Sequence, residues 1–363
     1  MKKLLLASAV AALFATTAQA APTVYGKAFV TVDYVDAEFD INEAKRDEIN
    51  KANELANMNR PDDDQLPMIT QVDANQDNLN LNSNGSRIGF KGAEAITEHT
   101  DVTYKLEYGV DIDGDDSKTF KRRSTFLGLK NDSFGEVRFG NMVAPLDYVN
   151  NVTVTKGYWD NLGSDNPEPT LSEGLTMTDA GRHSNTVMWL APQMAGIPLE
   201  FTAMYKTEEN NGDDGFGASL MFDQGSGFTA GIAYDNDLAI AGDVLRGSLT
   251  YDAANMTGFP IKLGALYQKA DFDYSNTDEK GFVISAEMGL TNFSKPASVY
   301  VQYNNTSDLA GNNGLDSDQF VLGGQYMYKP NMIGHAYAGY NKTDNNRSEA
   351  EVMAIGGGLE YVF

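Results

Sequence analysis

The last eleven residues, Met353-Ala354-Ile355-Gly356-Gly357-Gly358-Leu359-Glu360-Tyr361-Val362-Phe363, alternate between apolar side chains and small or polar ones. Successive side chains of a strand point to opposite faces, so this stretch predicts a strand with one apolar face and an aromatic end. The same pattern recurs about every ten to twenty residues along the chain, and the second parity stays largely polar. The sequence therefore predicts a transmembrane antiparallel β-barrel with lipid outside and water inside.

The number of candidate strands agrees with this fold. They number about sixteen, and bacterial single-chain barrels have an even number. Two long insertions, 36–82 and 143–183, interrupt the series. Without them, about 16 residues remain for each strand and its connection, which suits strands of about 10 residues and short turns. Residues 21–363 are thus expected to form a single barrel domain.

A β-sandwich is the alternative, because its strands show the same alternation with the apolar parity in the core. The amino terminus favours the barrel. Lys2 and Lys3 precede an apolar run over 4–14, and Ala18-Gln19-Ala20 follows. This pattern is typical of a cleaved signal peptide over residues 1–20. The apolar run is shorter than the roughly 20 residues of a spanning helix.

Composition excludes several classes of protein. The chain has no cysteine, so neither disulfides nor thiolate metal sites hold it together. The formal charge of −24 argues against nucleic-acid binding, which needs a basic surface. The three histidines, His99, His183 and His335, lack metal-ligand spacing, and no nucleophile motif such as Gly-x-Ser-x-Gly is present. We expect no enzyme, no metal and no cofactor.

Parity assigns the two faces of the barrel wall. Val102, Tyr104, Leu106, Tyr108 and Val110 form an outward row, and the alternate positions include Thr103, Lys105, Glu107 and Asp111. Charged side chains are therefore expected to point inward. Tight turns such as 130–133 alternate with longer acidic connections such as 207–214, which predicts two different rims, the tight one periplasmic.

Several segments resemble the general trimeric porins of Gram-negative outer membranes. They are Val24-Tyr25-Gly26-Lys27, Ser86-Arg87-Ile88-Gly89-Phe90-Lys91-Gly92, the hairpin from Phe126 to Gly140, Arg182 with Ser184-Asn185-Thr186, and the terminal Tyr361-Val362-Phe363. Two departures affect the expected constriction. Asn141 follows Gly140 where the family often has Arg, and the acidic Pro-Glu-Phe-Gly signature is only echoed in Pro167-Glu168-Pro169.

The resemblance implies a homotrimer in outer-membrane lipid, inserted by the barrel-assembly machinery through an assembly signal at Tyr361 and Phe363. It implies that the 143–183 segment folds into the lumen as a constriction loop. The basic wall facing this loop would comprise Lys27, Arg87, Arg123, Arg138 and Arg182. The acidic residues of the loop would be Asp147, Asp160, Asp165, Glu168, Glu173 and Asp179.

Opposed charges across a narrow aqueous gap orient dipolar solutes and select ions by sign. The expected function is passive diffusion of small hydrophilic solutes and ions. The net charge of −24 and the acidic external loops predict mild cation selectivity that weakens as salt rises, because charges farther apart than the Debye length, ~8 Å at physiological ionic strength, are largely screened. Two alternatives stay open: a substrate-selective channel, and a structural or adhesive barrel plugged by its long insertions.

The insertion 36–82, read as the first extracellular loop, contains a helix-like stretch over 41–59 that would cap the mouth. Asp111 to Asp116 superficially suggest a calcium loop. An EF-hand needs Gly at its sixth position and Glu at its twelfth, and Asp116 and Arg122 stand there instead. We interpret this segment as a hairpin loop. The family resemblance alternatively implies a latch onto a neighbouring subunit.

Overall fold

The computed structural model describes residues 21–41, 73–114, 119–160, 173–193, 197–208, 214–254, 260–345 and 348–363, with residues 47, 50, 51, 53, 54, 162 and 258. Seventeen strands form one sheet. They are β1 (Thr23–Ile41), β2 (Asp73–Ser83), β3 (Arg87–Thr97), β4 (Thr100–Val110), β5 (Phe120–Asn131), β6 (Gly135–Val143), β7 (Arg182–Leu190), β8 (Leu199–Lys206), β9 (Gly215–Asp223), β10 (Phe228–Asn236), β11 (Gly242–Asp252), β12 (Ile261–Phe272), β13 (Glu279–Leu290), β14 (Ala297–Ser307), β15 (Asp316–Lys329), β16 (Met332–Asp344) and β17 (Ser348–Val362).

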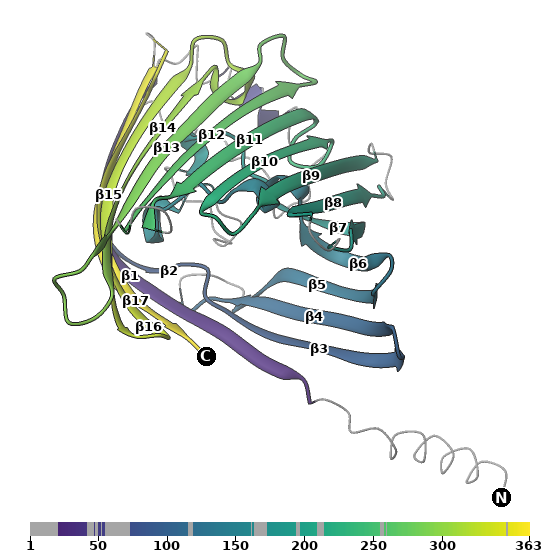
Figure 1. The fold of residues 1–363 in the computed structure, drawn as a ribbon. Coiled ribbons are helices and arrows are strands. Elements are labelled where there is room, and N and C mark those ends of the chain that lie inside the picture. Colours follow the sequence, from purple (N-terminus) through teal and green to yellow (C-terminus); the bar gives the residue numbers. More distant parts are fainter. Residues whose placement is uncertain are drawn as a thin grey trace, which may run out of the picture.

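The sheet closes on itself into a barrel (Figure 1). Strands pair antiparallel with their neighbours, and β17 returns to pair with β1. Strand β1 pairs first with β3 and then with β2, so these two are halves of one barrel strand interrupted at Asn84-Gly85-Ser86. The circumference is therefore sixteen strands, as the sequence predicted. Closure pairs the first and last strands of the ring with each other, which a membrane-spanning sheet requires, whereas β2 is paired along one edge, with β1, in the described residues.

The predicted parity is confirmed. Outward positions carry exposed apolar side chains, such as Ile232, Leu249 and Ile284. The alternate positions are buried and largely polar, and include Gln302, Asn304, Gln319 and Asn341. No helix among the described residues is long and apolar enough to cross a membrane.

The boundaries of the 36–82 insertion were wrong. Strand β1 continues to Ile41, and Asp73–Ser83 form β2 opposite it. The outward row of β1 changes from Val32 and Tyr34 to Asp36 and Glu38, so the strand continues beyond its apolar band. Because these residues lack apolar alternation, the sequence pattern assigned them to a loop and not to a strand. Residues 47, 50, 51, 53 and 54 are helical, and the rest of 42–72 lies outside the described residues.

The start of β1 and the carboxyl end of β17 meet at the rim of short turns. The Phe363 amide donates to the Gly26 carbonyl oxygen at 3.0 Å, and the Gly26 amide donates to the Phe363 carbonyl oxygen at 2.8 Å. The Phe363 ring covers Gly26, where a Cβ would lie only 2.4 Å from its Cζ. At the opposite rim lie the longer connections, including the segment 144–181 between β6 and β7.

Candidate pore

The described residues of segment 144–181, which are 144–160, 162 and 173–181, lie against the inward face of the wall. They include three short helices, η2 (Pro145–Val149), η3 (Gly157–Trp159) and η4 (Glu173–Leu175). Leu146 and Val149 of η2 are buried among Met188, Met204 and Val244. Further along, the Val154 amide donates to Gln302 Oε1 at 2.8 Å, and Ser285 Oγ donates to the Val152 carbonyl oxygen at 2.5 Å. Inward-facing side chains thus hold the segment inside the barrel.

Glycines in the wall make room for large side chains of this segment. The Trp159 side chain is fully buried, and its Nε1 donates to the Ala354 carbonyl oxygen at 3.2 Å. A Cβ built on Gly339 would lie 2.5 Å from the Trp159 ring. Likewise, a Cβ on Gly281 would lie 2.5 Å from Met177 Cε. Side chains at these wall positions would displace the segment.

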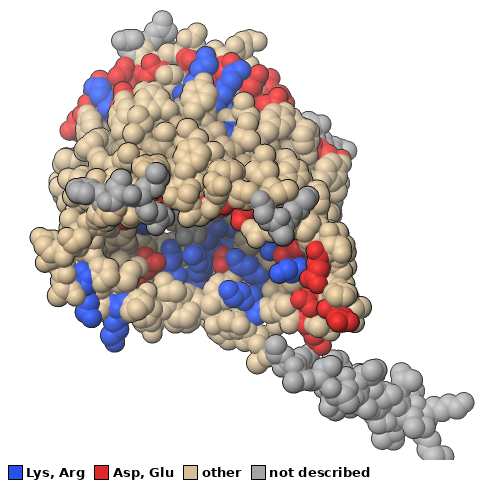
Figure 2. Space-filling view, in the orientation of Figure 1, with Lys and Arg blue, Asp and Glu red and all other residues tan. Residues whose placement is uncertain are grey.

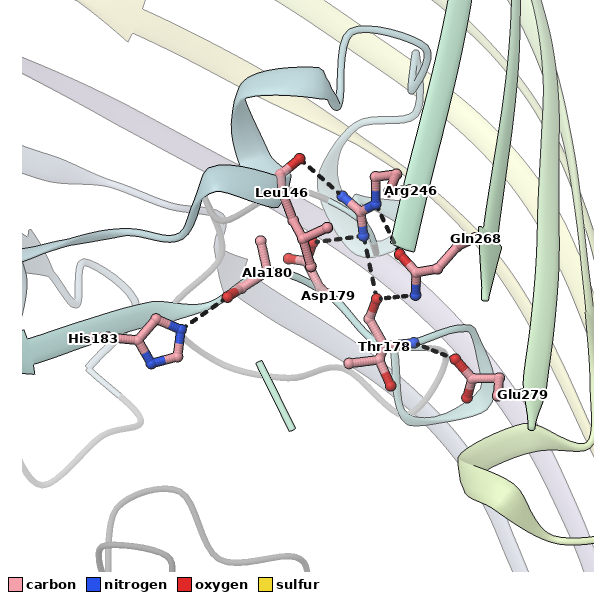
Figure 3. Close-up of polar contacts among 8 residues, drawn as sticks. All are labelled: Leu146, Thr178, Asp179, Ala180, His183, Arg246, Gln268 and Glu279. Atoms are coloured by element: carbon pink, nitrogen blue, oxygen red, sulfur yellow. Dashed lines mark hydrogen bonds and ion pairs between the residues drawn. The ribbon is translucent and has the colours of Figure 1, made fainter. Parts of the chain in front are cut away.

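A buried guanidinium joins both stems of the segment to the wall (Figure 3). Arg246 of β11 donates from Nη1 to the Leu146 carbonyl oxygen at 3.4 Å, and from Nη2 to the Thr178 carbonyl oxygen at 3.2 Å. Its Nε donates to Gln268 Oε1 at 2.8 Å. Gln268 Nε2 also donates to the Thr178 carbonyl oxygen, at 2.8 Å. We call Arg246, Gln268 and Glu279 the loop clamp.

Glu279 completes the loop clamp, because its Oε1 accepts the Thr178 amide hydrogen at 3.0 Å. Asp179 lies beside the clamp, with Oδ1 3.9 Å from Arg246 Nη2. Burial raises the pKa of this carboxyl to about 6, although Arg246 opposes the shift. The sequence reading missed Arg246. Its signal was a single Arg on the buried parity of β11, between Val244 and Ser248.

A second group of charges lies on β1, β3, β4 and β5, and we call Lys27, Arg87, Lys105, Glu107 and Arg123 the charged wall. Glu107 is its centre. It accepts from Arg123 Nε at 2.9 Å and from Tyr25 Oη at 2.8 Å, and its Oε2 lies 3.1 Å from Lys105 Nζ. Arg123 and Glu107 are only 1% and 4% exposed.

Three of the five predicted basic residues therefore lie together. Lys27 and Arg87 are directly opposite each other across β1 and β3, and Arg123 is held on β5. Arg138 lies on β6, where its Nη2 donates to Glu136 Oε2 at 2.8 Å and its guanidinium covers the Phe126 ring at 4.5 Å. Arg182 begins β7, opposite Val143.

The predicted acidic residues are distributed along the segment. Asp147 lies in η2, Asp160 follows η3, and Asp179 lies beside Arg246 rather than at the charged wall. Glu173 begins η4. Asp165 and Glu168 lie outside the described residues. Whether these acids form the narrowest point stays a prediction.

Figure 2 shows Lys and Arg side chains gathered in the hollow of the molecule, and a row of acidic side chains, with some Lys and Arg among them, along its upper edge. That edge carries the longer connections of β8–β15 (Figure 1). A polar-lined lumen with a charged wall and an acidic mouth suits water and small polar solutes. Among the described residues, no group of His, Asp and Glu could hold a metal ion.

Comparisons with known proteins agree with this geometry. A family model described as Gram-negative porin matches residues 7–348. The chain is 24% identical over its whole length to the monosaccharide porin of a Halomonas species, all of which it covers. It is 26% identical over 70% of its length to an outer membrane porin protein of Bordetella pertussis, 60% of which it covers. The chain belongs to the Gram-negative porins.

Solved structures show the same fold. The anion-selective porin from Comamonas acidovorans superposes with a TM-score of 0.63 at 15% identity, covering 94% of this chain and 99% of the other. A trimer form of OmpT from Vibrio cholerae gives a TM-score of 0.54 at 16% identity, covering 95% and 100%. These relationships identify an outer-membrane channel protein rather than an enzyme.

Proposed function

We propose that this porin is an open diffusion channel for small hydrophilic solutes and ions. The observation that carries the proposal is the docking of segment 144–181. Its apolar side chains are buried in the wall, and its stems are held by the loop clamp. A segment fixed to the wall narrows a lumen without filling it. Charged side chains remain in the hollow (Figure 2).

The deciding experiment is planar-bilayer recording of the purified protein. An open channel gives stepwise insertions, each with an ohmic conductance. A barrel that inserts but never conducts would support the plugged alternative. Liposome swelling with a small sugar distinguishes the two independently, because a plugged barrel admits no sugar. If deletion of residues 41–60 then restored flux, the plug would lie in the first long connection.

A substrate-selective channel is the second candidate, since a full-length relative is called a monosaccharide porin. Selective channels bind their solute, so the conductance should fall to a plateau as that solute is added. We propose the non-selective channel because the centre of the charged wall is a group of ion pairs around Glu107. Such a group supplies fixed charges and not an aromatic surface on which sugars could stack. Saturable block by one monosaccharide and not by others would favour the second candidate.

We propose mild cation selectivity in dilute salt. The chain carries 51 acidic and 27 basic residues, and acidic side chains gather at the mouth (Figure 2). The charged wall opposes this preference, because its four cations exceed the single carboxylate of Glu107. At physiological ionic strength the Debye length is ~8 Å, so salt screens the mouth strongly. The preference for cations should therefore weaken as salt rises.

We further propose a homotrimer. Trimers occur among structural neighbours with the same barrel. Crosslinking in native membranes tests the assembly, and a chain that runs only as a monomer after crosslinking would contradict it.

A further inference from the structure

A buried carboxylate on β1, that of Asp33, accepts hydrogen bonds from side chains on three strands. Its Oδ2 accepts from Thr31 Oγ1 of β1 at 2.5 Å and from Asn82 Nδ2 of β2 at 2.6 Å. Its Oδ1 accepts from the Tyr337 hydroxyl of β16 at 2.6 Å. The carboxylate is completely buried, and a buried charge needs such donors because water no longer solvates it. The position of the carboxylate therefore depends on β1, β2 and β16 together.

The Tyr337 hydroxyl continues this network into segment 144–181. It accepts the Tyr158 amide hydrogen of η3 at 3.2 Å. The Tyr158 ring packs edge-on against Trp159, with ring centroids 5.3 Å apart, and both rings belong to one buried cluster with Tyr337. Gly157 has a φ of +64°, and a Cβ there would overlap the Tyr337 hydroxyl. The tyrosine thus joins the wall carboxylate to the backbone of η3.

Strand β2 brings the other end of the network to the rim of long connections. The first long connection, residues 42–72, leaves β1 at Ile41 and returns to the barrel in β2. Asn82 is near the end of β2, and Asn84 Nδ2 donates to Thr31 Oγ1 at 2.7 Å. Among the described residues, β2 pairs along one edge only, with β1. A strand held along one edge opens more readily than one held along both, because fewer hydrogen bonds must break.

We propose that β2 positions η3 through a chain of hydrogen bonds, Asn82 to Asp33 to Tyr337 to the Tyr158 amide, which we call the relay. Asp33 and Tyr337 are its positioning residues. When β2 leaves β1, the Asp33 carboxylate loses a donor that fixes its orientation, and the Tyr337 hydroxyl loses a fixed acceptor. The backbone of η3 is then held less firmly in the lumen.

The relay connects an event at the outer rim with the width of the channel. A molecule that binds the first long connection and displaces β2 would loosen η3 from inside the wall. Only this effect on conduction rests on the proposed open channel, because the hydrogen bonds of the relay do not depend on flux. The position of η3 can therefore be tested separately from conductance.

Amide hydrogen exchange of the purified barrel, followed by mass spectrometry, tests the relay. The reporter is a peptide covering residues 155–160, in which the Tyr158 amide exchanges when η3 opens. Asn82→Leu removes the β2 donor and leaves segment 144–181 itself unchanged. Exchange of the reporter should become about tenfold faster, which is the effect of losing one hydrogen bond to a carboxylate.

The matched control is Asn78→Leu, at an exposed position of the same inward parity of β2, opposite Val35. It should leave exchange of the reporter unchanged. A peptide covering η2 is the internal control, because the loop clamp and not the relay holds η2. Its exchange should stay at the wild-type rate in Asn82→Leu.

The conservative variant Tyr337→Phe removes the hydroxyl and keeps the ring. It should accelerate exchange of the reporter at least as much as Asn82→Leu does. Because both substitutions act through the same chain of hydrogen bonds, adding Asn82→Leu to Tyr337→Phe should cause little further acceleration. In bilayers, both single variants should show more open-channel noise than wild type.

Three results would overturn the relay. Exchange of the reporter could stay at the wild-type rate in Asn82→Leu, or the two substitutions could act additively. Asn82→Leu could also accelerate the η2 peptide as much as the reporter, and Asn82 would then stabilise the barrel as a whole. If exchange behaves as predicted but no variant and no wild type conducts, the open channel is contradicted and the relay stands.

Discussion

Two regions of the inner wall carry opposite kinds of side chain, although both lie on the same parity of the same sheet. Under segment 144–181 the wall consists mainly of glycine, apolar residues and amides, with the buried Arg246 guanidinium and Glu279 carboxylate of the loop clamp. On β1 and β3–β5 it is the charged wall. The covered region must fit a packed segment without leaving polar groups unsatisfied, and the charged wall can pair its ions with each other and with water. The wall under segment 144–181 sets the shape of the lumen, and the charged wall sets the electric field across it.

The largest expected effect is that of Arg246→Ala. It removes the hydrogen bonds to Leu146 and Thr178 and leaves the Asp179 carboxylate without its neighbouring cation. Breaking a buried charged network of this kind costs about 3–5 kcal/mol. Segment 144–181 should detach, and bilayer recordings should show noisy, fluctuating conductance. Arg122→Ala, an exposed position on β5, is the control and should conduct as wild type does.

Gly339→Leu should have a smaller effect of the same kind. Its Cβ would lie 2.5 Å from the Trp159 ring, and overpacking of this sort costs about 1–3 kcal/mol. Trp159 should leave its site and become accessible to an aqueous quencher of fluorescence. The second tryptophan, Trp189, faces outward and supplies a constant background. If quenching stayed at the wild-type level, the wall beneath the segment would be more adaptable than we describe.

A third prediction compares the same change of charge in two places. Glu107→Gln removes the carboxylate between Arg123 and Lys105, so the lumen should shift towards anions. Glu287→Gln, on β13, removes an inward carboxylate that accepts from Ser298 and Gln325. The reversal potential should move more for Glu107→Gln. Equal shifts would mean that the charged wall has no special influence on ion flow.

The sequence predicted the fold because the signal for a closed barrel is local. Each strand carries its own alternation, and the last strand, which ends beside Phe363, pairs with β1. The sequence-based assignment failed where a strand continues beyond the apolar band, as at Asp36 and Glu38. There the outer face meets water, so outward residues are polar and the apolar–polar alternation is lost.

The candidate pore was only partly predictable. Lys27, Arg87 and Arg123 lie on the inward parity, and Lys105 with Glu107 was assigned there too, so their grouping follows from strand order. The partner of Asp179 could not be found in this way. A connection of 38 residues shows no hydrophobic periodicity from which the direction of its side chains could be predicted. Its contact with Arg246 depends on how it packs in three dimensions.

The central claim is that the charged wall sets the electric field in the lumen. The most direct test is the reversal potential of Arg87→Ala, measured across a KCl gradient in dilute salt. Arg87 lies opposite Lys27 across β1 and β3. We predict a shift towards cations relative to wild type, with unchanged open-channel noise, and a smaller shift in concentrated salt. An unchanged reversal potential, or a shift towards anions, would contradict the account.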